Sequence, residues 1–175
     1  MSILIRSTSF IMPDNIIWNS LSHKKIFFSE YGDLFSNTKH LNKINIEVIN
    51  IFLPDIIDYY CQESFKQKKE KKKLDKFINQ ITSKISKEKN KNFIICFSSY
   101  NYLNIINSAK NKEYFELLSI EFSEKIYKSS KKNNNMFFLN LDKVFAETGN
   151  NNCFDQRNFF TFRCRLSIKG LEILA

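Results

Sequence analysis

Two short stretches hold the residues that could do chemistry. Ser7, Thr8 and Ser9 follow an apolar run at the start of the chain, and Asp155 lies in the Asn-rich stretch NNCFDQRN near its end. A hydroxyl side chain becomes a nucleophile when a base, commonly a histidine oriented by an aspartate, accepts its proton. Ser7, Thr8 and Asp155 are therefore the candidate catalytic residues.

The base for such a nucleophile is missing from the C-terminal stretch. The two histidines, His23 and His40, both lie early in the chain. Arg157 follows Asp155 at the second position, and an arginine cannot act as a base near neutral pH. We therefore expect the three candidates to be vestigial and predict no serine-hydrolase turnover.

Both stretches also have a purely structural interpretation. The hydroxyls of residues 7–9 can form a turn and cap the next helix. Asp155 can cap a helix that carries Phe159, Phe160 and Phe162, and an aromatic cluster of this kind is typical of a core. If the site is vestigial instead, Asp155 should lie near the turn at residues 7–9, with an arginine or backbone N–H groups holding its carboxylate.

Strands separated by helices should position these residues. Five apolar runs read as strands; they span residues 2–7, 24–30, 44–54, 92–99 and 134–141. Helical spacing of apolar residues covers residues 55–89 and 111–132, and shorter helices are expected after Pro13, over 141–149 and over 166–174. This alternation predicts an α/β fold with a five-stranded parallel sheet.

Ligands of such sheets bind at the carboxyl ends of the strands. Ser9 follows the first strand and Asn101 follows the fourth, while Arg157 stands beside Asp155. Ser9, Asn101 and Arg157 are therefore candidate contacts for a bound substrate.

Composition fits one domain of 175 residues with a sizeable core, since 43% of the residues are hydrophobic and 18 are Phe. The four cysteines, Cys61, Cys96, Cys153 and Cys164, form no CxxC pair, which argues against a zinc site. We expect no metal and no cofactor. No apolar run is long enough to span a membrane, so a cytoplasmic protein with free thiols is expected, with Cys96 in the core.

The positive charge is concentrated in one segment. Eleven of the lysines lie between Lys66 and Lys91 against three acidic residues, which leaves +8 of the formal +9 charge there. Such a segment is either a solvated helix face or a docking patch for an acidic partner. The patch candidates are Lys68, Lys69, Lys71, Lys72 and Lys73. A nucleic-acid-binding domain is a further alternative, disfavoured because the charge is local and no recognised motif accompanies it.

Three stretches resemble one family. They are similar to the N-terminal domain of FkbH-like proteins. The first is ILIRSTSF with a following helix that contains Trp18, the second is FSEYGDLF, and the third runs from NMFFLNLDKVF through FDQRNFFTFRCRLS. The likeness extends over almost the whole chain and is most specific in the last stretch. It implies an SGNH-hydrolase-like, flavodoxin-like three-layer sandwich. The SGNH hydrolase family places an oxyanion-hole Asn after the fourth strand, where Asn101 stands.

In FkbH-like proteins this domain precedes a haloacid-dehalogenase-type domain that loads a glyceryl unit onto an acyl carrier protein. The Asp-x-Asp motif of that second domain is absent here, and NLDKVF is the nearest stretch. We therefore expect residues 1–175 to form a single SGNH-like domain.

The resemblance implies a non-catalytic recognition or scaffold domain in polyketide-type biosynthesis. Its partners would be an acidic acyl carrier protein and a haloacid-dehalogenase-type domain or protein, with no membrane involved. The alternative is an acyl or glyceryl transferase or esterase that uses the turn at residues 7–9.

Overall fold

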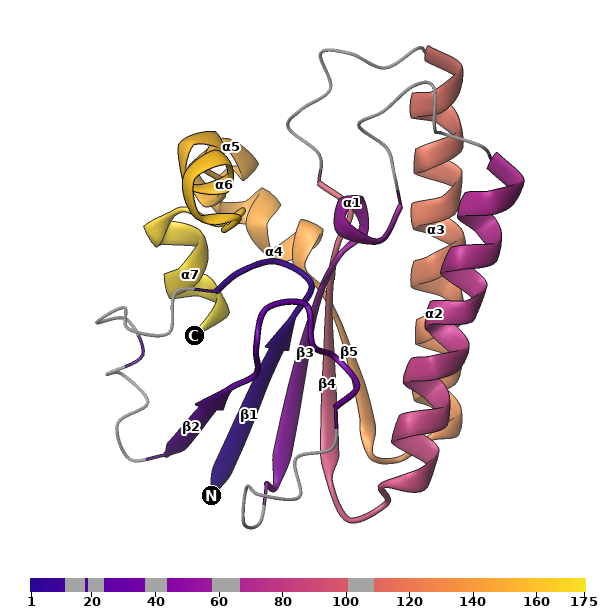
Figure 1. Ribbon diagram of the computed structural model, residues 1–175, viewed down its shortest axis with the longest axis vertical. Coiled ribbons are helices and arrows are strands. Elements are labelled where there is room, and N and C mark those ends of the chain that lie inside the picture. Colours follow the sequence, from indigo (N-terminus) through magenta and orange to yellow (C-terminus); the bar gives the residue numbers. More distant parts are fainter. Residues whose placement is uncertain (12–17, 19–23, 37–43, 58–66, 101–108) are drawn as a thin grey trace.

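A five-stranded parallel sheet forms the centre of the protein, with strand order β2-β1-β3-β4-β5 (Figure 1). The structure is a computed structural model that describes residues 1–11, 18, 24–36, 44–57, 67–100 and 109–175. The strands are β1 (Ser2–Ser7), β2 (Lys25–Phe28), β3 (Ile46–Phe52), β4 (Asn92–Ser98) and β5 (Met136–Asn140). The sheet confirms the predicted α/β fold and the five predicted strands.

Helices cover both faces of this sheet, which makes a three-layer sandwich (Figure 1). One face is covered by α2 (Gln67–Lys87) and α3 (Ala109–Lys132). The C-terminal helices gather over the other face: α4 (Leu141–Thr148), α5 (Asn150–Cys153), α6 (Gln156–Phe162) and α7 (Ile168–Leu174). A single helical turn, α1 (Leu53–Ile56), follows β3 directly.

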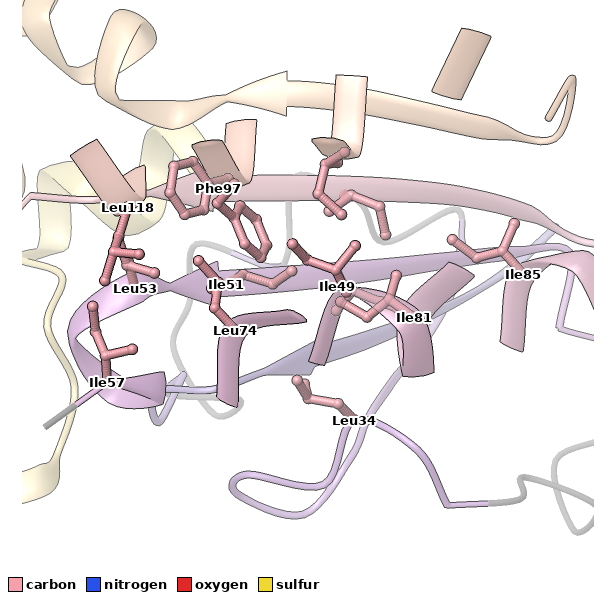
Figure 2. Packing of buried hydrophobic residues seen from close by; sticks show 14 of the residues in the cluster. Leu34, Ile49, Ile51, Leu53, Ile57, Leu74, Ile81, Ile85, Phe97 and Leu118 are labelled. Atoms are coloured by element: carbon pink, nitrogen blue, oxygen red, sulfur yellow. The ribbon is translucent and has the colours of Figure 1, made fainter. Parts of the chain in front are cut away.

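The first core lies between the sheet and the pair α2 and α3 (Figure 2). Apolar residues recur every three or four positions along each helix, so each helix turns one stripe towards the sheet. These stripes are buried and comprise Leu74, Ile78, Ile81 and Ile85 of α2 and Phe115, Leu118, Phe122 and Ile126 of α3. The ring of Phe122 stacks on that of Phe97 in β4 with centroids 4.6 Å apart.

The second core lies on the other face, beneath α4, α5 and α7. Cys96 of β4 is 3% exposed there, which confirms its predicted place in the core. Leu171 of α7 and Phe145 of α4 are fully buried against the same cluster. Gly170 lets α7 approach α5 closely, because a Cβ atom at this position would lie 2.1 Å from the carbonyl oxygen of Cys153.

Helix boundaries agree in part with those predicted. Gly149 ends α4 with φ 91°, as expected of a C-terminal glycine. The lysine-rich stretch belongs to α2, which begins at Gln67; the 55–89 helix is therefore α1 and α2, with residues 58–66 outside the described part. The helix expected after Pro13 also lies outside it, apart from Trp18, whose ring packs edge-on against Phe28. The short helix α5 was not predicted.

Candidate functional site

The turn after β1 and the C-terminal segment meet at the carboxyl ends of the strands. Ser9 donates its hydroxyl hydrogen to the carbonyl oxygen of Arg163 over 2.8 Å, and the backbone N–H of Phe10 donates to the same oxygen over 3.0 Å. The segment that carries Asp155 is therefore packed against the turn at residues 7–9, at the edge where the carboxyl ends of the parallel strands gather.

Thr8, Asp55 and Arg165 form a polar cluster at this edge, in which Arg165 is buried and the other two are partly buried. The hydroxyl of Thr8 donates to Asp55 Oδ2 over 3.2 Å and accepts from the N–H of Phe52 over 2.9 Å. The guanidinium of Arg165 binds Asp55 Oδ1 through Nε at 2.9 Å and through Nη2 at 2.5 Å. Arg165 is 1% exposed, and its guanidinium also lies 4.3 Å from the ring centre of Phe159.

Burial dominates the electrostatics of Asp55. Desolvation raises the pKa of its carboxyl group, and the hydrogen bonds and charge of Arg165 together with the hydroxyl of Thr8 oppose this only in part. A raised pKa makes the carboxylate a better proton acceptor. The same carboxylate is the partner of a buried guanidinium, so protonating it would leave that cation without its counter-ion.

The serines of the turn have structural partners. Ser7 Oγ accepts the backbone N–H of Ser9 over 3.1 Å, and both residues are buried. Asn50 of β3 stands opposite Ser7 in the strand register and is fully buried, yet both polar atoms of its amide lack a hydrogen bond within the described part of the chain. A hollow of about 40 Å³ beside the turn is lined by Ser7 and Ser9. This volume fits a few waters and is far below the roughly 300 Å³ of a typical ligand pocket.

Asp155 begins a helix, which is the structural interpretation offered by the sequence. Its Oδ1 accepts the backbone N–H groups of Arg157 at 2.8 Å and Asn158 at 3.4 Å, and so it caps α6. The side chain of Arg157 is 92% exposed and lies 3.6 Å from Asp155 Oδ2. No hydrogen bond joins the Asp155 side chain to Ser7, Thr8 or Ser9 among the described contacts, although its backbone N–H binds the carbonyl oxygen of Arg165 over 3.0 Å. Its catalytic role stays a prediction.

The prediction that the aromatic side chains of α6 lie in the core is wrong. Phe160 and Phe162 are 64% and 55% exposed, and α6 has no buried residue. The helix is only seven residues long and lies at the rim of the sheet, so one side can pack while the other meets solvent. The partly buried Phe159 contacts the guanidinium of Arg165 instead of the sheet.

A second polar cluster joins β4 to α4, and sequence reasoning missed it. Asp142 accepts the hydroxyl of Ser98 at 2.6 Å, the hydroxyl of Ser99 at 2.7 Å and the N–H of Ser99 at 2.9 Å. The sequence did contain a signal for this cluster. Ser98 and Ser99 stand at the end of β4, and Asp142 stands in the first turn of α4, the helix that follows β5. Because both carboxylate oxygens of Asp142 accept hydrogen bonds, the cluster fixes the start of α4 against the sheet.

The candidate lysines divide into two groups on α2. Lys71 pairs with Glu121 of α3 at 3.0 Å, and Lys73 pairs with Glu70 at 3.2 Å. Lys68, Lys69 and Lys72 are exposed, and none of them has an ion pair with a described residue. Of these two ion pairs, the one made by Lys71 joins α2 to α3, and the one made by Lys73 lies within α2.

Several predicted residues lie outside the described part of the chain. They are Asn101, His23, His40 and Cys61. Within the described ranges there is no group of three or more His, Cys, Asp or Glu side chains that could hold a metal ion. No helix in those same ranges is long and apolar enough to cross a membrane.

Comparisons with known proteins identify the fold. No protein-family model matches the sequence, and neither does any of the curated proteins. Among solved structures, the N-terminal part of BF1531 from Bacteroides fragilis, which contains a phosphatase domain and was complexed with Mg, superimposes with a TM-score of 0.78. The two sequences are 13% identical over 99% of this chain and 49% of that one, so this chain spans about half the length of the BF1531 fragment.

An esterase has a similar structure over most of its length. A catalytic mutant of Axe2, an acetylxylan esterase from Geobacillus stearothermophilus, gives a TM-score of 0.59 at 15% identity over 99% of this chain and 90% of the esterase. A second Axe2 mutant gives 0.56 at 14% identity with the same coverage. At such identities the likeness defines the fold alone: this protein has an SGNH-hydrolase-like α/β fold.

Proposed function

We propose that this chain is a recognition domain of the FkbH-like type without esterase activity. It acts beside a haloacid-dehalogenase-type domain in carrier-protein-dependent biosynthesis, where a glyceryl unit is loaded onto an acyl carrier protein. The observation that carries the proposal is the closed cluster of Thr8, Asp55 and Arg165, in which the hydroxyl at the strand end has its hydrogen and one lone pair engaged.

The cluster supports a non-catalytic role for two reasons. Among the residues that the structure describes, Asp55 is the one side chain bonded to the hydroxyl of Thr8, and it is also the counter-ion of a guanidinium that is 1% exposed. Accepting a proton would therefore cost the ion pair. The hollow of about 40 Å³ beside Ser7 and Ser9 is below the size of a typical ligand pocket, which supports the same role for these two serines.

The proposed partner domain rests on the sequence resemblance, and the fold comparison is compatible with it. The BF1531 fragment contains a phosphatase domain, and this chain accounts for 49% of its length. The remaining half of that fragment is not matched by this chain, which is compatible with a role beside a further domain. The glyceryl and carrier chemistry rests on the resemblance of the three sequence stretches to FkbH-like proteins.

One observation favours an esterase or acyl transferase instead. The hydroxyl of Thr8 lies 3.2 Å from Asp55, whose pKa is raised by burial, so a hydroxyl and a carboxylate base are in contact. Axe2, which shares the fold, is an acetylxylan esterase. In this alternative Asp55 takes the proton of Thr8 as the oxygen attacks an ester carbonyl.

Ester hydrolysis separates the two functions. The purified protein is assayed with p-nitrophenyl acetate and with a fluorophosphonate label, beside a Thr8→Val variant that keeps the side-chain shape and removes the hydroxyl. The proposed function expects buffer-level hydrolysis and no labelling for both proteins, together with measurable binding of an acyl carrier protein. Hydrolysis or labelling that disappears in Thr8→Val would establish the esterase alternative.

A further inference from the structure

An open groove of about 800 Å³ runs along the second half of α2. One wall is Phe35, from the segment after β2, and the floor is a helical stripe of polar side chains. The stripe comprises Lys76, Asn79, Gln80, Ser83 and Lys87. It spans three turns of helix, or roughly 17 Å at 1.5 Å per residue. That length matches a short helix laid alongside α2 far better than a single small anion.

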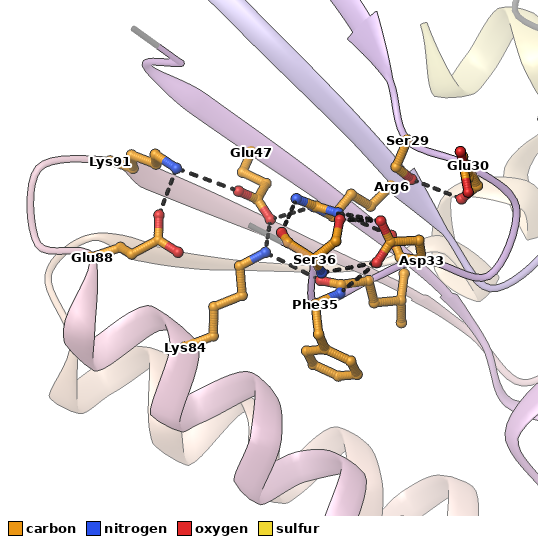
Figure 3. A network of polar contacts seen from close by, with 11 residues as sticks. Arg6, Ser29, Glu30, Asp33, Phe35, Ser36, Glu47, Lys84, Glu88 and Lys91 are labelled. Carbon is orange, nitrogen blue, oxygen red and sulfur yellow. Dashed lines mark hydrogen bonds and ion pairs between the residues drawn. The ribbon is translucent and has the colours of Figure 1, made fainter. Parts of the chain in front are cut away.

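A buried ion network fixes the wall of this groove (Figure 3). Arg6 of β1 binds Glu47 of β3 through Nε at 2.7 Å, and its Nη atoms bind the carbonyl oxygens of Asp33 at 3.0 Å and Ser36 at 2.8 Å. Asp33 Oδ1 accepts the N–H groups of Phe35 and Ser36. The turn that carries Phe35 is thereby bound to the sheet.

The same network ties α2 to this wall. Lys84 donates to Glu47 and to the carbonyl oxygen of Leu34, so this one lysine of the helix binds both the buried carboxylate of β3 and the turn. The ring of Phe35 meets Phe77 of α2 edge-on, with centroids 5.8 Å apart. Phe35 nevertheless remains 39% exposed. The groove is thus preformed, with an apolar surface left open to a partner.

The charges that remain available in the groove are positive. Lys84 is engaged by Glu47, and Glu88 at the end of the groove is engaged by Lys91 at 2.5 Å. Lys76 and Lys87 are exposed, and no ion pair joins either of them to a described residue. The groove therefore offers two cations about 17 Å apart, carboxamides between them and one aromatic wall.

We propose that this groove binds an acidic amphipathic helix of a partner protein. The inference rests on the proposed recognition function and names the surface through which it acts. Carboxylates spaced three turns apart would pair with Lys76 and Lys87, apolar residues between them would pack on Phe35, and Asn79 and Gln80 would satisfy polar groups at the margin.

Nucleic acid fits the same surface poorly. A phosphate backbone laid along the groove would meet the carboxylate of Glu88 at its end. Only two cations in the groove lack an ion pair with a described residue, and both stand on one helix stripe. A protein helix matches this narrow footprint.

The experiment compares matched charge reversals on one helix. The groove variant is Lys76→Glu with Lys87→Glu, and the control is Lys68→Glu with Lys69→Glu, which makes the same charge change outside the groove. Binding is measured by fluorescence anisotropy with three probes: a stapled acidic amphipathic peptide of about 15 residues, an acyl carrier protein, and duplex DNA. Circular dichroism verifies that each variant is folded, and Phe35→Ala tests the apolar wall separately.

The groove variant should weaken peptide binding about tenfold or more, whereas the control should change it less than about threefold. Binding to the parent protein should also weaken between about 50 and 300 mM salt. Peptide binding that survives in the groove variant, or that the control abolishes equally, would overturn the groove. Equal affinity for duplex DNA would also overturn it, in favour of a nucleic-acid surface.

The carrier-protein probe tests the proposed function independently. If the peptide binds in the groove and the carrier protein does not bind at all, the groove stands and the carrier-dependent function fails. If the carrier protein binds and only the control variant loses it, the function stands and the groove is wrong. Loss of carrier binding in the groove variant alone supports both.

Discussion

The pairing of Asp55 with Arg165 can be tested through stability. Arg165 is 1% exposed and binds Asp55 through two nitrogen atoms, at 2.9 and 2.5 Å. In an Asp55→Ala variant the guanidinium would stay buried without its counter-ion. Breaking a buried pair on one side costs about 3–5 kcal/mol, and we expect about 3 kcal/mol here. The lower end applies because the Asp55 side chain is 12% exposed and Arg165 keeps its contact with Phe159.

Urea unfolding followed by circular dichroism measures this loss. With a denaturant slope of about 2 kcal/mol per molar urea, a loss of 3 kcal/mol lowers the midpoint by about 1.5 M. The double variant Asp55→Ala with Arg165→Met removes both charges and should recover most of the loss, because an apolar side chain of similar volume costs little in place of a buried ion.

Two controls separate the buried pair from ordinary surface effects. Glu172→Ala breaks the exposed pair with Lys169, which is 3.0 Å long, and should cost less than about 1 kcal/mol. Asp155→Ala removes the cap of α6 and should cost about 1 kcal/mol. The reasoning is refuted if Asp55→Ala unfolds at the same urea concentration as Glu172→Ala. It is also refuted if the double variant is no more stable than Asp55→Ala.

Three further outcomes are expected. Gly170→Ala should lower the free energy of unfolding by about 2 kcal/mol in the same urea assay, since its Cβ would lie 2.1 Å from a backbone carbonyl oxygen of α5. Burial raises the pKa of Cys96 to about 12, so iodoacetamide at neutral pH should label this thiol only after denaturation, as peptide mass spectrometry would reveal; rapid native labelling would contradict this. Burial tends to raise the pKa of Asp33, but the hydrogen bonds of Ser36 and the charge of Arg6 outweigh burial and lower that pKa. The ionised Asp33 therefore stabilises the fold fully above about pH 4, and this contribution is lost as the pH falls below that value. Acid titration should therefore show a smaller drop in stability for Asp33→Asn, and an unchanged drop would refute the assignment.

Periodicity was sufficient to predict the sheet and the long helices. The buried strand β4 is a continuous apolar run, as strands covered on both faces are, and α2 and α3 carry stripes at helical spacing. These signals are local, and tertiary packing reinforces them. The predicted and observed elements therefore agree because the spacing of apolar residues within a few positions determines which face of a strand or helix is buried.

The buried charges could not be predicted in the same way. Arg6 and Glu47 lie inside strands, 41 positions apart, and Asp55 and Arg165 are separated by 110 positions. Nothing local distinguishes such a residue from an exposed one, because its burial depends on which distant side chain meets it. Sequence reasoning selected Asp155 for the strand-end site and did not select Asp55, whose carboxylate contacts Thr8 there.

The exposed phenylalanines of α6 show the converse error. Phe160 and Phe162 were expected in the core because large apolar side chains usually are buried. Burial depends on the position of the helix as well as on residue type, and α6 is held at the rim by its cap and by the carbonyl oxygen of Arg163. Two exposed aromatic rings on one short helix are nevertheless a feature found at surfaces that contact other molecules.

The position of Arg165 also limits what the hydrolase-like fold implies about activity. The C-terminal segment is anchored to the strand ends by the Arg165–Asp55 pair and by the contact between Ser9 and the Arg163 carbonyl, and the bridge between Phe154 and Leu166 holds the segment together internally. Each of these contacts stabilises the segment whether or not a substrate ever binds. The hydrolase-like fold therefore does not by itself imply turnover, because the contacts at this edge account for its structure without a substrate. Turnover is established only if a measured rate is abolished by Thr8→Val.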